Sequence, residues 1–161
     1  MGMATERTPS PADHRDGFAP SAPMLANSAF LLFRLGARAT RSLGDALAPF
    51  DLRPRHYAVF NLLDAHTGIA QAALATRLGM DVNSVVKTLD ELEGQGYVER
   101  RRDPADRRRH SVVLTPRGQA ALRDVRAAAD AVEAALLGAL GDDERRQLHA
   151  LLRKVEAGGP G

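Results

Sequence analysis

Apolar residues recur at helical spacing through most of the chain between its two ends. A first amphipathic helix is predicted over about residues 26–48, and Pro54 suits the first turn of a second helix that runs to about residue 65. A short alanine-rich helix is predicted over 71–78, and it ends at Gly79, a residue suited to a left-handed cap. The first half of the chain is therefore predicted to be helical.

The next predicted helix begins after Asp81, whose carboxylate can cap it. Its apolar positions form one stripe, expected to face the core: Val82, Val85, Val86, Leu89 and Leu92. Its opposite face carries mostly small polar groups and one lysine: Asn83, Ser84, Lys87, Thr88 and Glu91. Two short helices around a glycine-containing turn are typical of a helix-turn-helix, and such side chains can reach base edges or phosphates. The alternative is an ordinary solvated helix face.

Two short strands are predicted next, over residues 97–101 and 111–114, with an arginine-rich hairpin tip between them. Residues 97–115 hold six arginines against three carboxylates, a net charge of +3, while the rest of the chain sums to −1. Such a tip can follow a DNA backbone and insert a guanidinium into the minor groove. The candidates at the tip are Arg107, Arg108 and Arg109, with Asp103 and Asp106 expected to fix the turn and orient an arginine. The alternative is a solvated hairpin whose charges prevent edge pairing.

Composition narrows the function classes. The chain has no cysteine, which excludes disulfides, thiolate metal sites and cysteine nucleophiles. Its five histidines never fall at i, i+4 on one helix, and it has neither a glycine-rich phosphate loop nor a nucleophile elbow. We therefore expect no catalytic residue, no metal site, no cofactor and no enzymatic activity. No apolar run approaches the roughly 18 residues that span a bilayer, so we expect a cytoplasmic protein without membrane contact.

The segment from Leu74 to Gly118, which includes LDELEGQGYVERRRDPADRRRHSVVLTPRG, resembles the MarR family of bacterial transcriptional regulators. The most specific parts are Asp-Pro-x-Asp-Arg-Arg at residues 103–108 and Leu-Thr-x-x-Gly at 114–118, which are similar to the family's wing and wing exit. The order of helices extends the resemblance to about residues 26–157.

The resemblance implies a homodimer in which the first helix and the last two helices of each chain interlock, leaving two winged-helix lobes to read a pseudo-palindromic operator in double-stranded DNA. It also implies that Arg108 enters the minor groove and that Asp106 holds it. The positions that match the family's DNA-facing ones are Asn83, Ser84, Lys87 and Thr88. We expect a repressor that a small effector releases. The alternative is an architectural or protein-binding winged-helix module with neither operator nor effector.

The predicted fold class is mostly α with a small β-hairpin, a winged helix-turn-helix with helical dimerisation segments. Residues 1–24, rich in proline and without periodicity, are expected to be a disordered arm. Residues 52–115 are predicted to form the winged-helix domain, and residues 25–51 and 116–157 the dimerisation region. A long helix after Thr115-Pro116, apolar along one side to near Ala139, fits burial against a partner's helix.

The second helix departs from the family pattern, which usually opens with a threonine and has a glutamine a few residues on. This chain has Arg53 and His56 at those positions, which leaves the cap of the helix open. Members of the family bind small lipophilic or aromatic effectors near this place. The candidates for such a pocket are Arg34, His56, Tyr57 and Phe60. The favoured alternative is a packed core with one hydrogen-bonded histidine.

Overall fold

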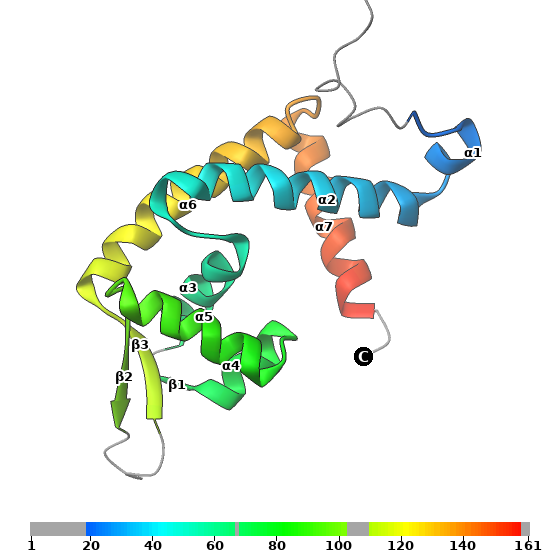
Figure 1. Ribbon diagram of the computed structural model, residues 1–161. Coiled ribbons are helices and arrows are strands. Elements are labelled where there is room, and N and C mark those ends of the chain that lie inside the picture. The colour runs from blue at the N-terminus through cyan, green and yellow to red at the C-terminus, as the bar shows by residue number, and fades with distance from the viewer. Residues whose placement is uncertain (1–18, 67, 103–109, 159–161) are drawn as a thin grey trace, which may run out of the picture. The chain divides into compact units, whose positions relative to one another are not determined.

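The computed structural model describes residues 19–66, 68–102 and 110–158 (Figure 1). The chain divides into two compact units, residues 1–37 and 38–161, which are considered in turn. The predicted fold class is confirmed, because the described chain is mostly helical with one small antiparallel sheet. None of the described helices is long and apolar enough to cross a membrane.

The described part of the first unit is helical. A short helix, α1 (Ala22–Leu25), overlaps the end of the predicted arm, and the first 18 residues of that arm lie outside the described part. The longer helix α2 (Ser28–Leu47) starts here and continues into the second unit. Asn27 caps it, because its Oδ1 accepts a hydrogen bond of 3.0 Å from the Phe30 N–H.

The second unit contains the predicted helix-turn-helix. After α2 and a 3₁₀ turn, η2 (Ala48–Phe50), the chain forms α3 (Pro54–Ala65), α4 (Gln71–Leu78) and α5 (Val82–Gly94). Gly79 ends α4 with a φ of 60°, the left-handed cap that was predicted. Asp81 caps α5, since its Oδ1 accepts the Ser84 N–H at 2.9 Å. These local signals were sufficient to predict the element boundaries.

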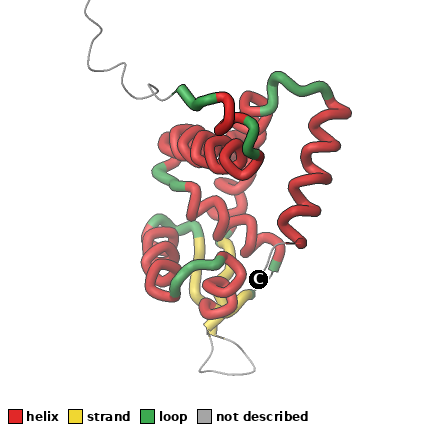
Figure 2. The backbone as a smooth tube through the Cα atoms, turned by 90° about the vertical axis from the view of Figure 1, so that its right-hand side faces the viewer, coloured by secondary structure: helices red, strands yellow, loops and turns green. Residues whose placement is uncertain are grey.

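The sheet has three strands, one more than predicted. Strands β2 (Val98–Arg102) and β3 (His110–Leu114) form the expected hairpin, and β1 (Ile69–Ala70) pairs with the other side of β3. In the register, Val112 lies between Ile69 on one side and Arg100 on the other. The sequence pattern did not predict β1, because a two-residue strand has no period of its own and exists only through its partner. Figure 2 shows the strands lying beside helices.

The hairpin leads directly into α6 (Pro116–Leu136), and the last helix is α7 (Asp142–Gly158). Thr115 caps α6, accepting the Gly118 N–H on its Oγ1 at 3.0 Å. A Cβ at position 118 would overlap the carbonyl oxygen of Tyr97, so only glycine fits where α6 passes the start of β2. This close approach explains the glycine of the Leu-Thr-x-x-Gly motif.

The hydrophobic core belongs to the winged-helix part and its immediate borders. All buried apolar side chains of the described residues lie between Leu47 and Val125. Three of the five residues of the predicted α5 stripe are buried and Val86 is half-buried, but Val82 is 54% exposed, so its placement in the core was wrong. Val82 is the first residue of α5, and its exposure shows that neighbouring elements do not cover this side at the start of the helix.

Candidate nucleic-acid interface

The N-terminal half of α5 presents two polar side chains to the outside. Asn83 and Lys87 are exposed and lie one helical turn apart. Ser84, the third predicted contact, is half-buried, and its hydroxyl donates to the carboxylate of Asp81. The hydrogen bonds from Ser84 hold the pKa of Asp81 below its ordinary value, so the cap stays ionised. The exposed Asn83 and Lys87 therefore carry most of the hydrogen-bonding capacity of this face.

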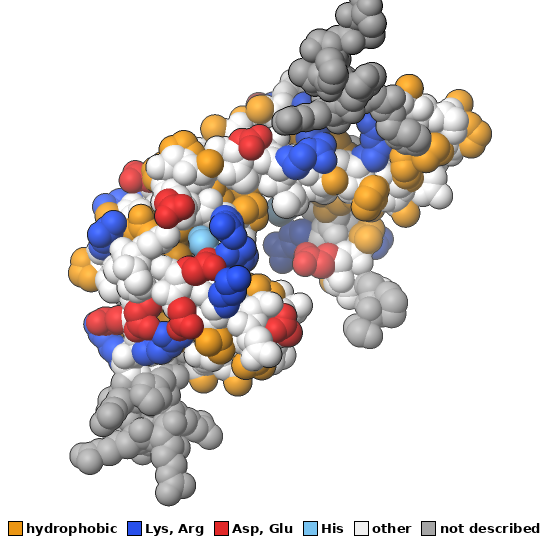
Figure 3. Space-filling view, viewed as in Figure 1, with side chains coloured by type: hydrophobic (Ala, Val, Ile, Leu, Met, Phe, Trp, Pro, Cys, Tyr) orange, Lys and Arg blue, Asp and Glu red, His pale blue; other side chains and the backbone are white. Residues whose placement is uncertain are grey.

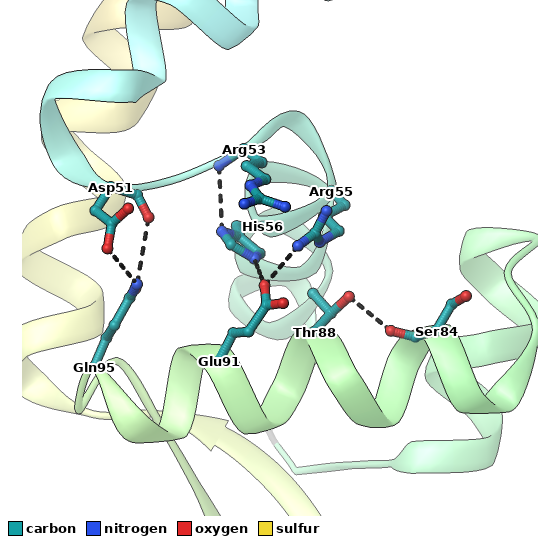
Figure 4. A network of polar contacts seen from close by, with 8 residues as sticks. All are labelled: Asp51, Arg53, Arg55, His56, Ser84, Thr88, Glu91 and Gln95. Carbon is teal, nitrogen blue, oxygen red and sulfur yellow. Dashed lines mark hydrogen bonds and ion pairs between the residues drawn. The ribbon is translucent and has the colours of Figure 1, made fainter.

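Thr88 does not lie on the outer face, and this prediction was wrong. Its side chain is 1% exposed, and its Oγ1 donates a hydrogen bond of 2.7 Å to the Ser84 carbonyl (Figure 4). Position 88 lies on the flank of α5 that packs against α3. A helical pattern shows which face is polar, but the neighbouring helix decides how much of each flank is covered.

The C-terminal half of α5 carries three carboxylates, each held by an arginine from another element. Arg55 of α3 lies 2.6 Å from Glu91 Oε2, and Arg100 of β2 lies 2.6 Å from Asp90 Oδ1 and also pairs with Glu93. Acidic and basic side chains accordingly lie side by side on this face (Figure 3). The pairing offsets charges that would repel a phosphate backbone. Sequence spacing did not reveal either arginine's role, since the partners are 36 and 10 positions apart along the chain.

His56 links the start of α3 to α5. Its Nδ1 accepts the Arg53 backbone N–H at 3.2 Å, and its Nε2 lies 2.8 Å from Glu91 Oε2 (Figure 4). A neutral imidazole with its proton on Nε2 satisfies both contacts. Burial is the main cause that lowers the pKa of His56 below 6.5, which agrees with the neutral form. His56 thus closes the α3 N-terminus in the way that a capping-box side chain does.

Glu91 is the acceptor shared by this cluster. The hydrogen bond from Arg55, with a smaller contribution from His56, lowers the pKa of Glu91 to about 2. A second link lies one turn further along α5, where Gln95 Nε2 donates to the Asp51 carbonyl at 3.3 Å. The first link ties α5 to the start of α3, and the second ties the residue after α5 to the turn before α3. Both hold α5 against this part of the domain.

The predicted wing residues Asp103, Asp106, Arg107, Arg108 and Arg109 lie outside the described residues. The strands on either side of them are described, and they pair from Val98 with Leu114 to Arg102 with His110. The base of the hairpin is thus antiparallel, as predicted.

The residues predicted as an effector pocket are divided between the two units of the chain. His56 and Phe60 are 2% and 0% exposed in the core, which confirms the favoured alternative for these two. Arg34 belongs to the first unit, where its guanidinium lies 5.9 Å from the ring centroid of Phe30. Tyr57 lines a cavity.

That cavity is a groove of about 430 Å³ within the second unit. Its walls come from the end of α2, the start of α3, and helices α6 and α7, and they are mainly apolar. Arg145 and His149, one turn apart on α7, supply polar groups to its lining. The sequence did not predict this groove, although a basic pair at i, i+4 beside the leucines of α7 was a usable signal. Among the described residues, no three His, Asp or Glu side chains cluster to hold a metal ion.

The relatives found by comparison with known proteins are regulators of transcription. A family model described as MarR family matches residues 50–109. The chain is 32% identical over 102 residues to a regulatory protein named for the hcr operon of Thauera aromatica, covering 63% of this chain and 61% of that one. It is 33% identical over 105 residues to transcriptional regulator HosA of Escherichia coli O111:H-, covering 65% and 78%. The matched segment thus spans less than two thirds of the Thauera protein.

Solved structures extend the match to most of the chain. The transcriptional repressor CouR bound to a 23-mer DNA duplex superposes with a TM-score of 0.78 at 32% identity, covering 86% of this chain and 99% of that one. CouR from Rhodococcus jostii RHA1 bound to p-coumaroyl-CoA gives a TM-score of 0.74 at 30% identity, covering 88% and 99%. With the winged helix and its wing-exit glycine in place, these matches show that the chain belongs to the MarR family.

Proposed function

We propose that this protein is a transcriptional regulator that binds double-stranded DNA sequence-specifically, with α5 entering the major groove. The observation that carries the proposal is the exposed pair Asn83 and Lys87 on a helix whose carboxylates are each paired with an arginine. Asparagine can pair with adenine, and lysine with guanine or phosphate. The DNA-bound CouR structure, similar over 86% of this chain, supports the same use of the fold.

We propose further that the protein acts as a homodimer on a pseudo-palindromic operator. The support is the apolar surface of α7, where Leu151, Leu152 and Val155 are between 41% and 63% exposed. The first unit separately exposes Leu31, Leu32, Phe33 and Leu35. Burying such surfaces against a second copy is the usual source of dimer stability. A dimer would place its two recognition helices about 34 Å apart, one turn of DNA.

The wing is proposed to add a minor-groove contact. By similarity to the family's motif, Arg108 is proposed to enter the groove and Asp106 to hold it, with Arg107 and Arg109 as further candidates for contact with the DNA backbone. Replacing Arg108 with alanine should lower operator affinity by about 1–3 kcal/mol without changing the dimer. An unchanged gel-shift midpoint for Arg108→Ala would remove the wing from the mechanism.

An effector is proposed to bind in the groove and to release the DNA, so that the protein acts as a repressor. The groove has the size and apolar lining of a small-molecule site, and Arg145 and His149 can meet an anionic or phenolic group. CouR bound to p-coumaroyl-CoA shows that a similar protein binds an aromatic ligand. A ligand that prefers the DNA-incompetent geometry about 100-fold supplies about 2.7 kcal/mol. Ala39→Trp, which fills the groove, should retain operator binding and lose the response to aromatic acids.

Selection of bound duplexes from random DNA tests the main proposal. A two-fold symmetric consensus, preferred over random DNA by at least about 10³ at fixed salt, is the expected result. Equal affinity for all sequences with a steep dependence on salt would instead indicate the architectural module. Repeating the titration with Lys87→Ala should weaken binding, and with exposed Ala150→Ser on α7 it should not.

A further inference from the structure

The large apolar side chains that are exposed in the described residues fall into two groups. Those of one group lie on α1, α2 and α7, and the exposed side chains of α2 and α7 belong to the surfaces proposed to meet a second copy. The other group has a single member within the described residues, Val82, which is 54% exposed at the first position of α5. The dimer contact already proposed accounts for the exposed side chains of α2 and α7, whereas Val82 lies in the winged helix.

Helix formation does not require a valine at position 82. The start of α5 is fixed by the Asp81 carboxylate, which accepts the Ser84 N–H. A β-branched residue is also a poorer helix former than alanine. The side chain does not close the core either, since Val85, Leu89 and Leu92 fill it from the inner side of the same helix. The exposed valine is therefore neither a capping nor a core residue.

The position of Val82 places it where a recognition helix contacts bases. In helix-turn-helix proteins the N-terminal residues of the recognition helix approach the base edges in the major groove. Val82 is the first residue of α5, and the exposed Asn83 follows it directly. An isopropyl group can neither donate nor accept a hydrogen bond. Of the groups that base pairs present in the major groove, the thymine C5-methyl is the apolar one.

We propose that Val82 contacts the C5-methyl group of one thymine in each operator half-site, and that it is a determinant of sequence specificity. This inference rests on the proposed function and names part of what the DNA-binding face reads. Asn83 supplies the hydrogen bonds to an adjacent base. Val82 adds an apolar contact, which is lost when the base has no methyl group. The two neighbouring positions together distinguish more sequences than either does alone.

Deoxyuridine gives a direct probe, because it pairs like thymidine but lacks the methyl group. With the consensus from random selection in hand, each thymine of one half-site is replaced in turn by deoxyuridine. Affinity of the full-length protein is measured by fluorescence anisotropy at one salt concentration. The expected result is one position per half-site where the replacement weakens binding about fourfold, the factor that corresponds to burying one methyl group.

Two variants separate the methyl contact from other effects. Val82→Ala should reduce the ratio of the affinities for the thymine and uracil duplexes at that position toward one. Val82→Thr keeps one of the two methyl groups, so it should retain part of the preference for the thymine duplex over the uracil duplex. Lys87→Ala, at another exposed position of the same helix, is the control, and it should weaken binding to both duplexes equally. Circular dichroism and thermal unfolding check that each variant is folded, which is expected because position 82 is exposed.

The outcomes distinguish this inference from the function on which it rests. If random selection yields no consensus, the proposed sequence-specific function fails and takes this inference with it. If a consensus appears but no thymine responds to loss of its methyl group, or the half-sites contain no thymine, the Val82 contact alone is overturned. The Val82 contact is also overturned if Val82→Ala leaves the ratio of thymine to uracil affinities unchanged at a responsive position.

Discussion

The winged-helix part and the C-terminal helix α7 differ in where their apolar side chains go. The winged helix buries Val59, Phe60 and Leu89 completely within its own chain. Helix α7 has a strongly amphipathic sequence, yet it has no buried residue, and Val155 is 63% exposed. One region is therefore stabilised by internal packing, whereas the other has an apolar face that needs a second surface. This difference fits the proposal that the winged helix binds DNA while α7 contributes to assembly.

The two regions also use charge differently. In the winged helix, ion pairs join separate elements, as Arg55 joins α3 to Glu91 of α5 and Arg100 joins β2 to Asp90. In α7, Arg146 pairs with Asp143 within the same helix, and both side chains are more than 70% exposed. Exposed pairs of that kind contribute little to stability. The ion pairs between elements hold α5 in position, whereas the Arg146–Asp143 pair lies within α7 and joins it to no other element.

The largest expected effect is on the internal core. Phe60 is fully buried and its ring meets Tyr97 edge to face, with centroids 5.6 Å apart. Phe60→Ala should lower the free energy of unfolding by about 3–5 kcal/mol, because it removes apolar contacts and leaves a cavity. Urea titration measures this. Val155→Ala is the matched comparison, and in dilute monomer it should change the value by no more than about 0.5 kcal/mol. Equal losses for both variants would contradict the division into two regions.

The next effect concerns the junction between the hairpin and α6. Gly118→Ala should cost about 3 kcal/mol, since the added Cβ must displace the backbone carbonyl of Tyr97. Gly94→Ala is the control, because no atom lies within 4 Å of its added Cβ, and it should stabilise α5 by about 0.5–1 kcal/mol. Thermal unfolding of both variants ranks them. A Gly118→Ala protein as stable as the parent would show that α6 can shift freely against β2.

A smaller effect is expected on assembly. Val155→Asp places a charge on the apolar face of α7 and should raise the dimer dissociation constant at least about tenfold, because burying a valine contributes roughly 1.5–3 kcal/mol. Sedimentation velocity over a concentration series measures it. Ala150→Asp adds the same charge on the opposite side of the helix and should leave the dimer intact. Dissociation by Ala150→Asp but not by Val155→Asp would reverse the proposed interface.

The smallest effect is a pH dependence of the winged helix. Because the pKa of His56 is lowered in the folded protein, the unfolded chain takes up a proton first as the pH falls below about 6.5. Stability should therefore be complete above pH 6.5 and decline below it, before the loss from Glu91, which begins near pH 4.5 and extends toward its folded pKa of about 2. His56→Gln should remove the first decline while keeping the cap. The midpoints of urea unfolding at pH 7.5 and 5.5, measured for the parent protein and for His56→Gln, test this prediction.

Much of the fold followed from local sequence signals. The cap at Asp81, the left-handed Gly79 and the Thr115-Pro116 helix start each act within a few residues, so spacing alone located them. The same reasoning misplaced Thr88 and Val82, because a residue's face on a helix does not show how far neighbouring elements extend over it. The groove could not be predicted in detail, since its walls come from four helices that are distant in sequence.

The sequence by itself determined the helix-turn-helix, the hairpin base and the family, because caps, turns and periodic apolar positions act over short separations. Only the tertiary structure decided which side chains face outward at α5, that Arg55 and Arg100 offset its acidic groups, and that His56 takes the place of a conventional cap. The physical reason is that burial and charge pairing depend on contacts between elements, and many arrangements of those elements share the same local pattern.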